Sequence, residues 1–237
     1  MRLASLLYAL LTLFIMACVA GFLLIYAPGT PLPDALNPIK PLNVTDPLSP
    51  LTRTKMAQAL ASGATCRAAL GTGAEFEPLP DLTTPSQCGI ADRVTLRSVG
   101  GARMTPVETR CQTALRLAMW HRHGVIPAAR THFDQEVTAI QHASSYSCRQ
   151  IRTPQGSSGR LSSHATAEAI DISGVTLGDG RRLRLLSGWN DAGTQAAFFR
   201  DLRNSACTWF RVTLGPDYNS LHADHFHLQH SGWGLCR

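Results

Sequence analysis

Charge is missing from the beginning of the chain, and several common signatures are missing from all of it. Residues 3–27 contain no charged side chain. No C-x-x-C pair occurs, which argues against a cysteine zinc finger. No run of Lys and Arg with interleaved aromatic residues is present, so we expect no nucleic-acid partner. The glycine and serine residues at 156–159 lack the G-x-S-x-G pattern of a nucleophile elbow, so a serine hydrolase has no support.

The net charge of +6 belongs to the chain after residue 50. Residues 1–50 sum to zero, because Arg2 and Lys40 stand against Asp34 and Asp46. The later basic groups are nearly all Arg and are spread along the chain. Two interpretations stay open: attraction to an anionic surface such as a cell wall or membrane, and an Arg-rich composition without a function, which we favour.

The uncharged stretch at 3–27 predicts a single transmembrane anchor over residues 1–27. As a helix it would be ~37 Å long, longer than the ~30 Å hydrocarbon core of a bilayer. A cleaved signal peptide has a shorter apolar region, and here the small residues near Cys18 fall in mid-run. Arg2 and the amino terminus would stay cytoplasmic, which predicts a bacterial inner-membrane protein with its C-terminal domain in the periplasm. We interpret Cys18 as a membrane-buried thiol rather than a lipoprotein site.

A Pro-rich segment follows the anchor. Residues 28–50 contain seven prolines, which disfavour a helix and favour extended, stiff conformations. We interpret this segment as a linker that holds a domain of residues 51–237 away from the bilayer.

Six of the seven cysteines lie after residue 50. They are widely spaced and even in number, which predicts three disulfides in an oxidising compartment. The sequence does not select among the fifteen possible pairings of Cys66, Cys88, Cys111, Cys148, Cys207 and Cys236.

Hydrophobic periodicity and turn residues predict an α+β domain with a small antiparallel sheet flanked by helices. Asp179-Gly180 marks the turn of a hairpin, and residues 156–159 are expected to form a flexible loop. Helices are expected over 51–62, from Thr105 to about His123, after Pro127 and from Thr194 to about Ser205. Strands are expected over 93–99, 137–140, 169–174, 182–186, 209–214 and 225–228.

Two stretches about fifty residues apart hold the candidate metal ligands. His164 and Asp171 lie in the first stretch, and His225 and His227 lie in the second. Residues two apart on a strand project from the same face, so these two histidines would lie together. Small residues at 165, 167 and 169 would let the chain fold back and close a site. Two imidazoles, one carboxylate and a position left for water make up a catalytic zinc site.

The residue pattern Ser162-x-His164-x-x-Ala167-x-Ala169-x-Asp171 resembles the S-x-H-x-x-G-x-A-x-D signature of the LAS metallopeptidases. That group includes D-Ala-D-Ala peptidases, murein endopeptidases and the zinc domain of Hedgehog. Ala167 in place of Gly is the one departure. The H-x-x-H-x-H spacing of residues 222–227 is similar to the murein endopeptidases. The resemblance implies a LAS/Hedgehog-like fold and Zn²⁺ held by His164, Asp171 and His227.

Residues from about 60 to 237 resemble the bacterial extensin-like C-terminal domain family more closely. The shared residues are Tyr146-x-Cys148-Arg149, Ser163-His164-Ala165, Ala169-Ile170-Asp171, Leu214-Gly-Pro-Asp-Tyr-Asn219 and His222-x-Asp224-His225-Phe-His227. This resemblance implies more about the fold than about the reaction.

A peptidase would also need a general base beside the metal. The candidates are His225, Asp224 and His222. A regular strand would point Asp224 away from His227, whereas His225 points the right way, so we place His225 first and Asp224 next. Arg149 resembles the arginine before the signature in carboxypeptidase members, where it would stabilise an oxyanion or bind a carboxylate. A surface ion pair is an equally good interpretation of Arg149.

The leading hypothesis is therefore a membrane-anchored zinc peptidase that hydrolyses amide bonds of peptidoglycan stem peptides. Its partners would be peptidoglycan or another cell-wall polymer, and the inner membrane. The alternative is a non-catalytic wall-binding or structural module with a structural metal site. The sequence specifies neither the bond cut nor the oligomeric state.

Overall fold

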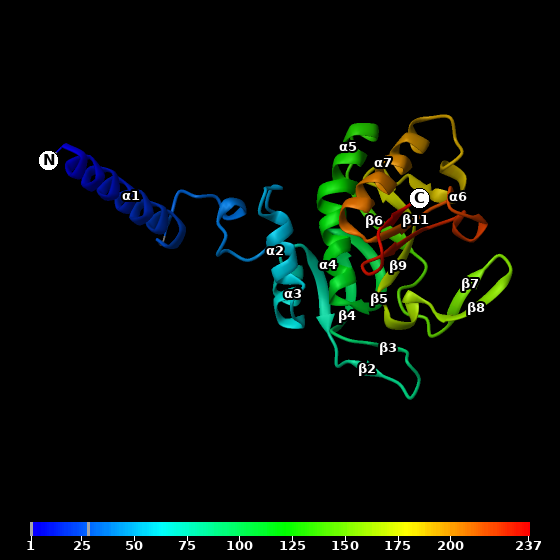
Figure 1. Cartoon of the computed structure of the whole chain (residues 1–237). Coiled ribbons are helices and arrows are strands. Elements are labelled where there is room, and N and C mark those ends of the chain that lie inside the picture. Colours follow the sequence, from blue (N-terminus) through cyan, green and yellow to red (C-terminus); the bar gives the residue numbers. More distant parts are fainter. Residues whose placement is uncertain (1, 28) are drawn as a thin grey trace.

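The N-terminal apolar stretch is a single long helix in the computed structural model, which describes residues 2–27 and 29–237. Met1 and Pro28, parts of the predicted anchor and linker, lie outside the described residues. Helix α1 (Arg2–Tyr26) extends away from the rest of the molecule (Figure 1). Its Leu3–Tyr26 portion is long and apolar enough to cross a membrane, and none of it is buried inside the molecule. It is a signal sequence or an anchor, and together with three disulfides it indicates an extracytoplasmic domain.

The Pro-rich segment is partly built into the folded body. Its residues 34–36 form the short 3-10 turn η1 (Asp34–Leu36). Further along, Leu42 and Val44 are buried in the same hydrophobic cluster as the domain. The Val44 amide donates to Thr72 Oγ1 at 2.8 Å, which ties the segment to the body. Earlier in the segment, Lys55 donates to the Asp34 carbonyl and Ala35 is buried, so only the part before Asp34 resembles a spacer.

One mixed sheet organises the body, and the hairpins β2–β3 and β7–β8 lie apart from it. The helices are α2 (Thr52–Ala59), α3 (Gly63–Leu70), α4 (Cys111–Trp120), α5 (Ile126–Phe133), α6 (Leu185–Gly188) and α7 (Thr194–Trp209), with short turns η2 (His121–Val125), η3 (Ser163–Thr166) and η4 (Ser220–His222). The strands are β1 (Ala74–Pro78), β2 (Leu82–Thr83), β3 (Gly89–Ile90), β4 (Arg93–Val99), β5 (Ala102–Arg110), β6 (Val137–His142), β7 (Gln150–Thr153), β8 (Gly156–Leu161), β9 (Ala169–Leu177), β10 (Arg182–Arg184), β11 (Val212–Leu214), β12 (Phe226–Gln229) and β13 (Leu235–Cys236).

The α+β class is confirmed, but the sheet is larger than predicted. It has nine strands in the order β1-β4-β5-β6-β9-β12-β11-β13, with β10 also paired to β9. The pairing is mostly antiparallel; β5–β6 and β11–β13 are parallel. The prediction of a small sheet missed β1 and β13, and it assigned much of β5 to a helix. Short edge strands carry too little periodicity to be recognised in the sequence.

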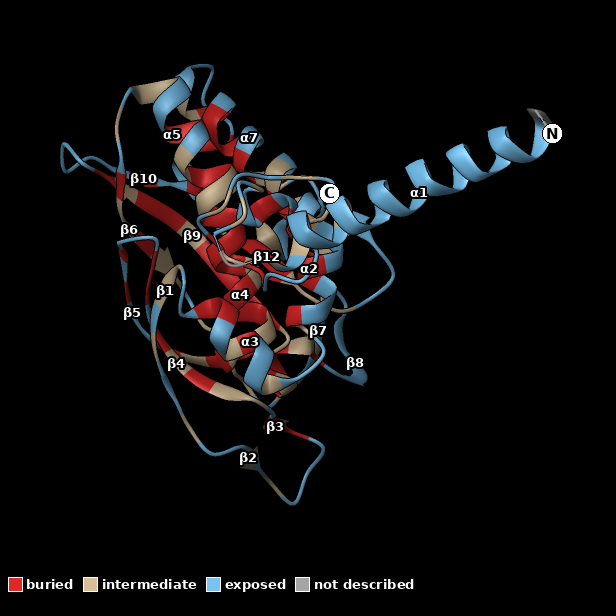
Figure 2. Cartoon of the chain, turned by 90° about the vertical axis from the view of Figure 1, so that its left-hand side faces the viewer, coloured by how far each residue is buried: buried red, intermediate tan, exposed pale blue. Residues whose placement is uncertain are grey.

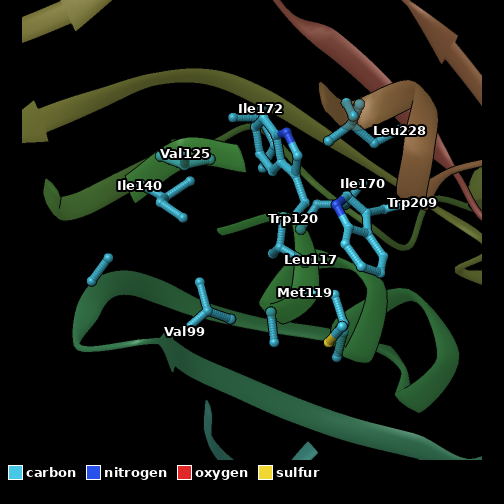
Figure 3. Close-up of a cluster of buried hydrophobic side chains, with 14 of the residues drawn as sticks. Val99, Leu117, Met119, Trp120, Val125, Ile140, Ile170, Ile172, Trp209 and Leu228 are labelled. Carbon is cyan, nitrogen blue, oxygen red and sulfur yellow. The ribbon is translucent and has the colours of Figure 1, made fainter. Parts of the chain in front are cut away.

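The core lies between this sheet and the helices packed on one side of it. Figure 2 shows buried residues concentrated between the strands β4, β5, β6 and β9 and the helix α4. Trp120 of α4 is fully buried at the centre of this layer, among Val125, Ile140 and Ile172 (Figure 3). Its indole N–H donates to the Leu202 carbonyl of α7 at 3.1 Å, so the buried polar group is satisfied. The sheet therefore rests on a rigid helical layer.

The helix predicted from Thr105 to about His123 is present as α4, but its predicted start at Thr105-Pro106 is wrong. These residues lie in β5, and α4 begins at Cys111. Pro106 cannot donate to a strand ladder, but here the β4–β5 register is irregular between Leu96 and Ser98, where such a residue is tolerated. The apparent helix start was a proline at a bulge.

The flexible loop predicted at 156–159 is also wrong. It is part of β8, which pairs antiparallel with β7. Every residue of β8 is exposed, so the strand has no apolar alternation by which the sequence could reveal it. The predicted hairpin around Asp179-Gly180 is confirmed as β9–β10.

Three disulfides join the six downstream cysteines, as predicted, and Cys18 is free. They link Cys66–Cys111, Cys88–Cys148 and Cys207–Cys236. The second disulfide joins the β2–β3 hairpin to the residue just before Arg149, at the base of the β7–β8 hairpin.

Candidate metal centre

The two predicted stretches meet because β9 and β12 are antiparallel neighbours. Asp171 of β9 lies directly opposite His227 of β12 in the register. His164 lies on η3, immediately before β9. Hydrogen bonding along the sheet thus fixes the separation of two ligands, and a short turn delivers the third.

A tight turn between His164 and β9 closes the site. Ala167 has a left-handed conformation with φ 51° and ψ 30°. Its N–H donates to the His164 carbonyl at 3.2 Å, and Thr113 Oγ1 donates to the Ala167 carbonyl at 2.9 Å. Ala165, Ala167 and Ala169 are fully buried, which confirms that this turn needs small residues.

Three ligand atoms converge on one point. His164 Nε2 lies 3.1 Å from His227 Nδ1 and 3.2 Å from Asp171 Oδ1, and His227 Nδ1 lies 3.0 Å from the same carboxylate oxygen. All three residues are buried. Ligands about 2.0–2.1 Å from a tetrahedral Zn²⁺ are roughly 3.3 Å apart, so this triangle matches one face of such a site.

The partners of the other ring nitrogens support a cation at the centre. His164 Nδ1–H donates to the Ser145 carbonyl at 2.9 Å, which leaves a lone pair on Nε2. His227 Nε2 lies 3.4 Å from Gln229 Oε1, and the Gln229 amide N–H donates to Ser231. The Gln229 oxygen is therefore an acceptor, and the lone pair of His227 is on Nδ1. Two lone pairs and a carboxylate then face one another, so this group could hold a metal ion.

Electrostatics keep the acid of this group ionised. Burial raises the pKa of Asp171, but protons on the facing nitrogens of His164 and His227 would donate to its carboxylate, and the net effect lowers the pKa below its usual range. A bound metal cation would take the place of those protons. An ionised carboxylate is the form that binds a metal.

Two further histidines lie beside the triangle. His225 Nε2 is 3.7 Å from Asp171 Oδ1, and the His222 ring is centred 5.8 Å from that of His227. Burial and the neighbouring histidines lower the pKa of His222 to about 4, so it is neutral at pH 7. Its Nδ1–H donates to Asn219 Oδ1 at 2.7 Å, which leaves its Nε2 as an acceptor.

Asp224 does not line the site. Its carboxylate is largely exposed and lies 2.8 Å from His225 Nδ1. An aspartate there orients the imidazole and directs the other ring nitrogen, Nε2, toward Asp171. The structure thus brings His225 and His222 to the cluster, and it gives Asp224 a supporting position.

The cluster forms one wall of a pocket of about 680 Å³. Arg149, Tyr218 and Leu221 also line this pocket. The structure therefore brings Arg149 to the site, although Arg149 is not bonded to any of the three candidate metal ligands. The Arg149 guanidinium donates to the Gln150 carbonyl at 3.2 Å. The other interpretation of Arg149 was a surface ion pair. Arg149 forms no such pair with the residues that the structure describes.

A comparison with protein-family models matches residues 64–237 to the extensin-like protein C-terminus. The chain belongs to this extensin-like family. No curated protein and no solved structure matches it. The metal group, the pocket and all three disulfides of the extensin-like domain lie within the matched residues.

Sequence reasoning missed several supports of the extensin-like site. The Ser145 carbonyl fixes His164, but a backbone acceptor leaves no signal in a sequence. Gln229 could have been found, because it lies two residues after His227 on the same strand face. His230 follows β12, is half-buried and lies with its Nδ1 2.9 Å from Thr113 Oγ1, away from the ligand triangle.

Proposed function

We propose that this extensin-like domain is a zinc peptidase that cleaves amide bonds in the stem peptides of peptidoglycan, held to the inner membrane of a bacterium by α1. The observation that carries the proposal is the convergence of His164, Asp171 and His227 at the wall of a pocket. Two further histidines, His222 and His225, line the same pocket. A purely structural site would not need the pocket. The resemblance to the LAS metallopeptidases supports the same reaction class.

Zn²⁺ bound there would act as a Lewis acid toward water and toward the scissile carbonyl. His225 is the proposed general base: its Nε2 faces the cluster, and Asp224 holds its Nδ1. It would accept a proton from the attacking water and return it to the leaving amine. His222, neutral and oriented by Asn219, would accept a hydrogen bond from the water or the substrate.

The position of the site supports an outward-facing substrate. In Figure 1 the β7–β8 hairpin, which carries residues that line the pocket, lies at the end of the body opposite α1. A domain anchored by α1 would therefore present its pocket away from the bilayer, in the periplasm, where cell-wall polymers lie.

The test is release of peptides from purified peptidoglycan by the full chain loaded with zinc. We expect Asp224→Ala/His225→Ala to reduce the rate of peptide release on the order of 100-fold or more, while each chain still binds one zinc. His132→Ala is the matched control, because His132 bonds Asp201 on the surface. Release at the wild-type rate by the double variant would disprove the mechanism. A zinc-loaded wild type that releases nothing would favour the non-catalytic wall-binding module.

A further inference from the structure

Three arginines line the pocket from one side. Arg149 precedes β7, Arg152 lies on β7 and Arg160 lies on β8. The hairpin that carries them projects from the body in Figure 1, and its strand β8 is exposed along its whole length. Side chains placed on such a projecting hairpin are not needed for the core.

These arginines have no carboxylate partner among the described residues, unlike several arginines elsewhere in the body. Arg93 and Arg97 pair with acids of neighbouring strands at 2.5 and 3.0 Å. Neither Arg152 nor Arg160 forms such a pair within the described part of the chain. The pocket thus gains positive charge that nothing in the described structure neutralises.

The pocket's own acids are already engaged. The Arg110 guanidinium donates to Glu168 Oε1 at 3.0 Å, and Ser231 Oγ donates to the other carboxylate oxygen of Glu168. Asp171 belongs to the ligand triangle. Neither acid is therefore available to balance the arginines of the hairpin. Uncompensated charges of one sign in a pocket attract ligands of the opposite sign.

We infer that the β7–β8 hairpin is an arm that binds a carboxylate of the substrate, with Arg152 and Arg160 as specificity-determining residues. The inference rests on the proposed function for the class of substrate, a peptide. It adds that this peptide carries a free carboxylate beyond the bond that is cut. A guanidinium presents a planar fork of N–H donors that matches a carboxylate.

The rest of the lining favours a peptide over a phosphate polymer. Leu161, Tyr218 and Leu221 are exposed and line the same pocket as the arginines. Exposed apolar groups beside cationic ones suit a ligand with short apolar side chains and a carboxylate. A polyol phosphate would leave these apolar groups without a partner.

The base of the arm is fixed. The Cys88–Cys148 disulfide ends at the residue before Arg149, and the Ser162 amide donates to the Arg149 carbonyl at 3.0 Å. Ser162 in turn leads into the turn that carries His164. The arm is thus attached at both ends close to the ligand triangle, at a constant position relative to the reacting bond.

The experiment measures binding, so that it does not depend on cleavage. Full chain in detergent, carrying Asp224→Ala/His225→Ala to prevent turnover, is titrated calorimetrically with a synthetic stem pentapeptide and with the same peptide after its carboxylates are converted to amides. We expect the carboxylate form to bind about tenfold more tightly at low salt, and Arg152→Gln/Arg160→Gln to remove that preference.

The matched control is Arg182→Gln/Arg184→Gln, which removes the same charge from exposed positions of β10 outside the pocket. It should retain the preference. Equal binding of both peptides, a preference that survives Arg152→Gln/Arg160→Gln, or an equal loss in the control would overturn the inference. Tighter binding of polyglycerol phosphate than of the peptide would also overturn it. A normal preference without release of peptides from peptidoglycan would instead reject only the proposed reaction.

Discussion

The ligand triangle and the β7–β8 arm line the same pocket, but they are built in different ways. His164, Asp171 and His227 are buried and are held by strand pairing, a tight turn and hydrogen bonds to their outer nitrogens. The arm is exposed, contributes nothing to the hydrophobic cluster and is fixed at its base. Under the proposed function, the sheet and its turn would carry the reaction, and the hairpin would carry the recognition. Each of the following variants should affect one side more than the other.

The largest expected effect is the loss of metal from the triangle. Replacing His227 by Ala removes one of three donors and one of the two histidines that lower the pKa of Asp171. We expect zinc affinity to fall on the order of 100-fold or more, because a direct ligand contributes more than its supporting partners. Metal content of the dialysed full chain measures this. Arg152→Gln is the control from the arm and should keep its zinc. Equal zinc loss in both variants would contradict the separation of metal binding in the triangle from ligand recognition by the arm.

Next is the disulfide at the base of the arm. Cys88–Cys148 spans 60 residues, and the chain-entropy account gives it about 4 kcal/mol of stability. Cys88→Ala/Cys148→Ala should lower the free energy of unfolding by up to that amount and weaken the preference for carboxylate peptides, with zinc content unchanged.

The matched control is Cys207→Ala/Cys236→Ala. This disulfide spans 29 residues, which corresponds to about 3.6 kcal/mol in the same account, and it lies far from the arm in the sequence. Denaturant unfolding and peptide titration together separate the two outcomes. If both double variants changed peptide binding equally, the disulfide at the arm would have no special role in positioning it.

A smaller effect tests the rigid body behind the sheet. His121 is 1% exposed, and neither ring nitrogen has a partner among the described residues. Burial, with a smaller contribution from Arg122, lowers its pKa to about 4 from an ordinary 6.5. The unfolded chain therefore binds more protons between these values, so stability falls as pH drops from 6.5 toward 4, by about 3 kcal/mol in all.

Replacing His121 by Leu should remove that part of the acid sensitivity. Urea unfolding measures the free energy of unfolding at pH 7.5, about one unit above this window, and at pH 4.5, about half a unit above its lower end. The difference between the two pH values should shrink relative to wild type. An unchanged difference would show that His121 is not buried as a neutral group.

The smallest effect is expected at the turn of the triangle. Ala167 has φ 51°, which costs an L-residue roughly 1 kcal/mol, and Gly would relieve it. Gly would also lose the buried methyl group and gain entropy in the unfolded chain, each worth about 0.5–1 kcal/mol. We therefore expect Ala167→Gly to change stability by less than about 1 kcal/mol and to leave zinc affinity unchanged. A loss of several kcal/mol in denaturant unfolding would show that the methyl group itself supports the ligands.

Much of the metal group could be predicted from the sequence because its determinants are local. His227 lies on β12 and His225 lies one residue before that strand, so their spacing of two residues is local. The small residues around His164 indicate a tight turn. The supports were not predictable in the same way. A carbonyl such as that of Ser145 becomes a partner only after segments nineteen residues apart fold together.

The sequence by itself determined the apolar N-terminal helix, the number of disulfides, the α+β class and the residues able to hold a metal, because composition and short-range spacing decide each of these. The tertiary structure decided the nine-strand order, the disulfide partners and the arginine arm. Pairing of β9 with β12 places Asp171 opposite His227, and no local pattern specifies which distant strand becomes a neighbour. The pairing of distant strands depends on burying the apolar face of the whole sheet at once. The spacing of two ligand residues along one strand depends only on the backbone geometry of that strand.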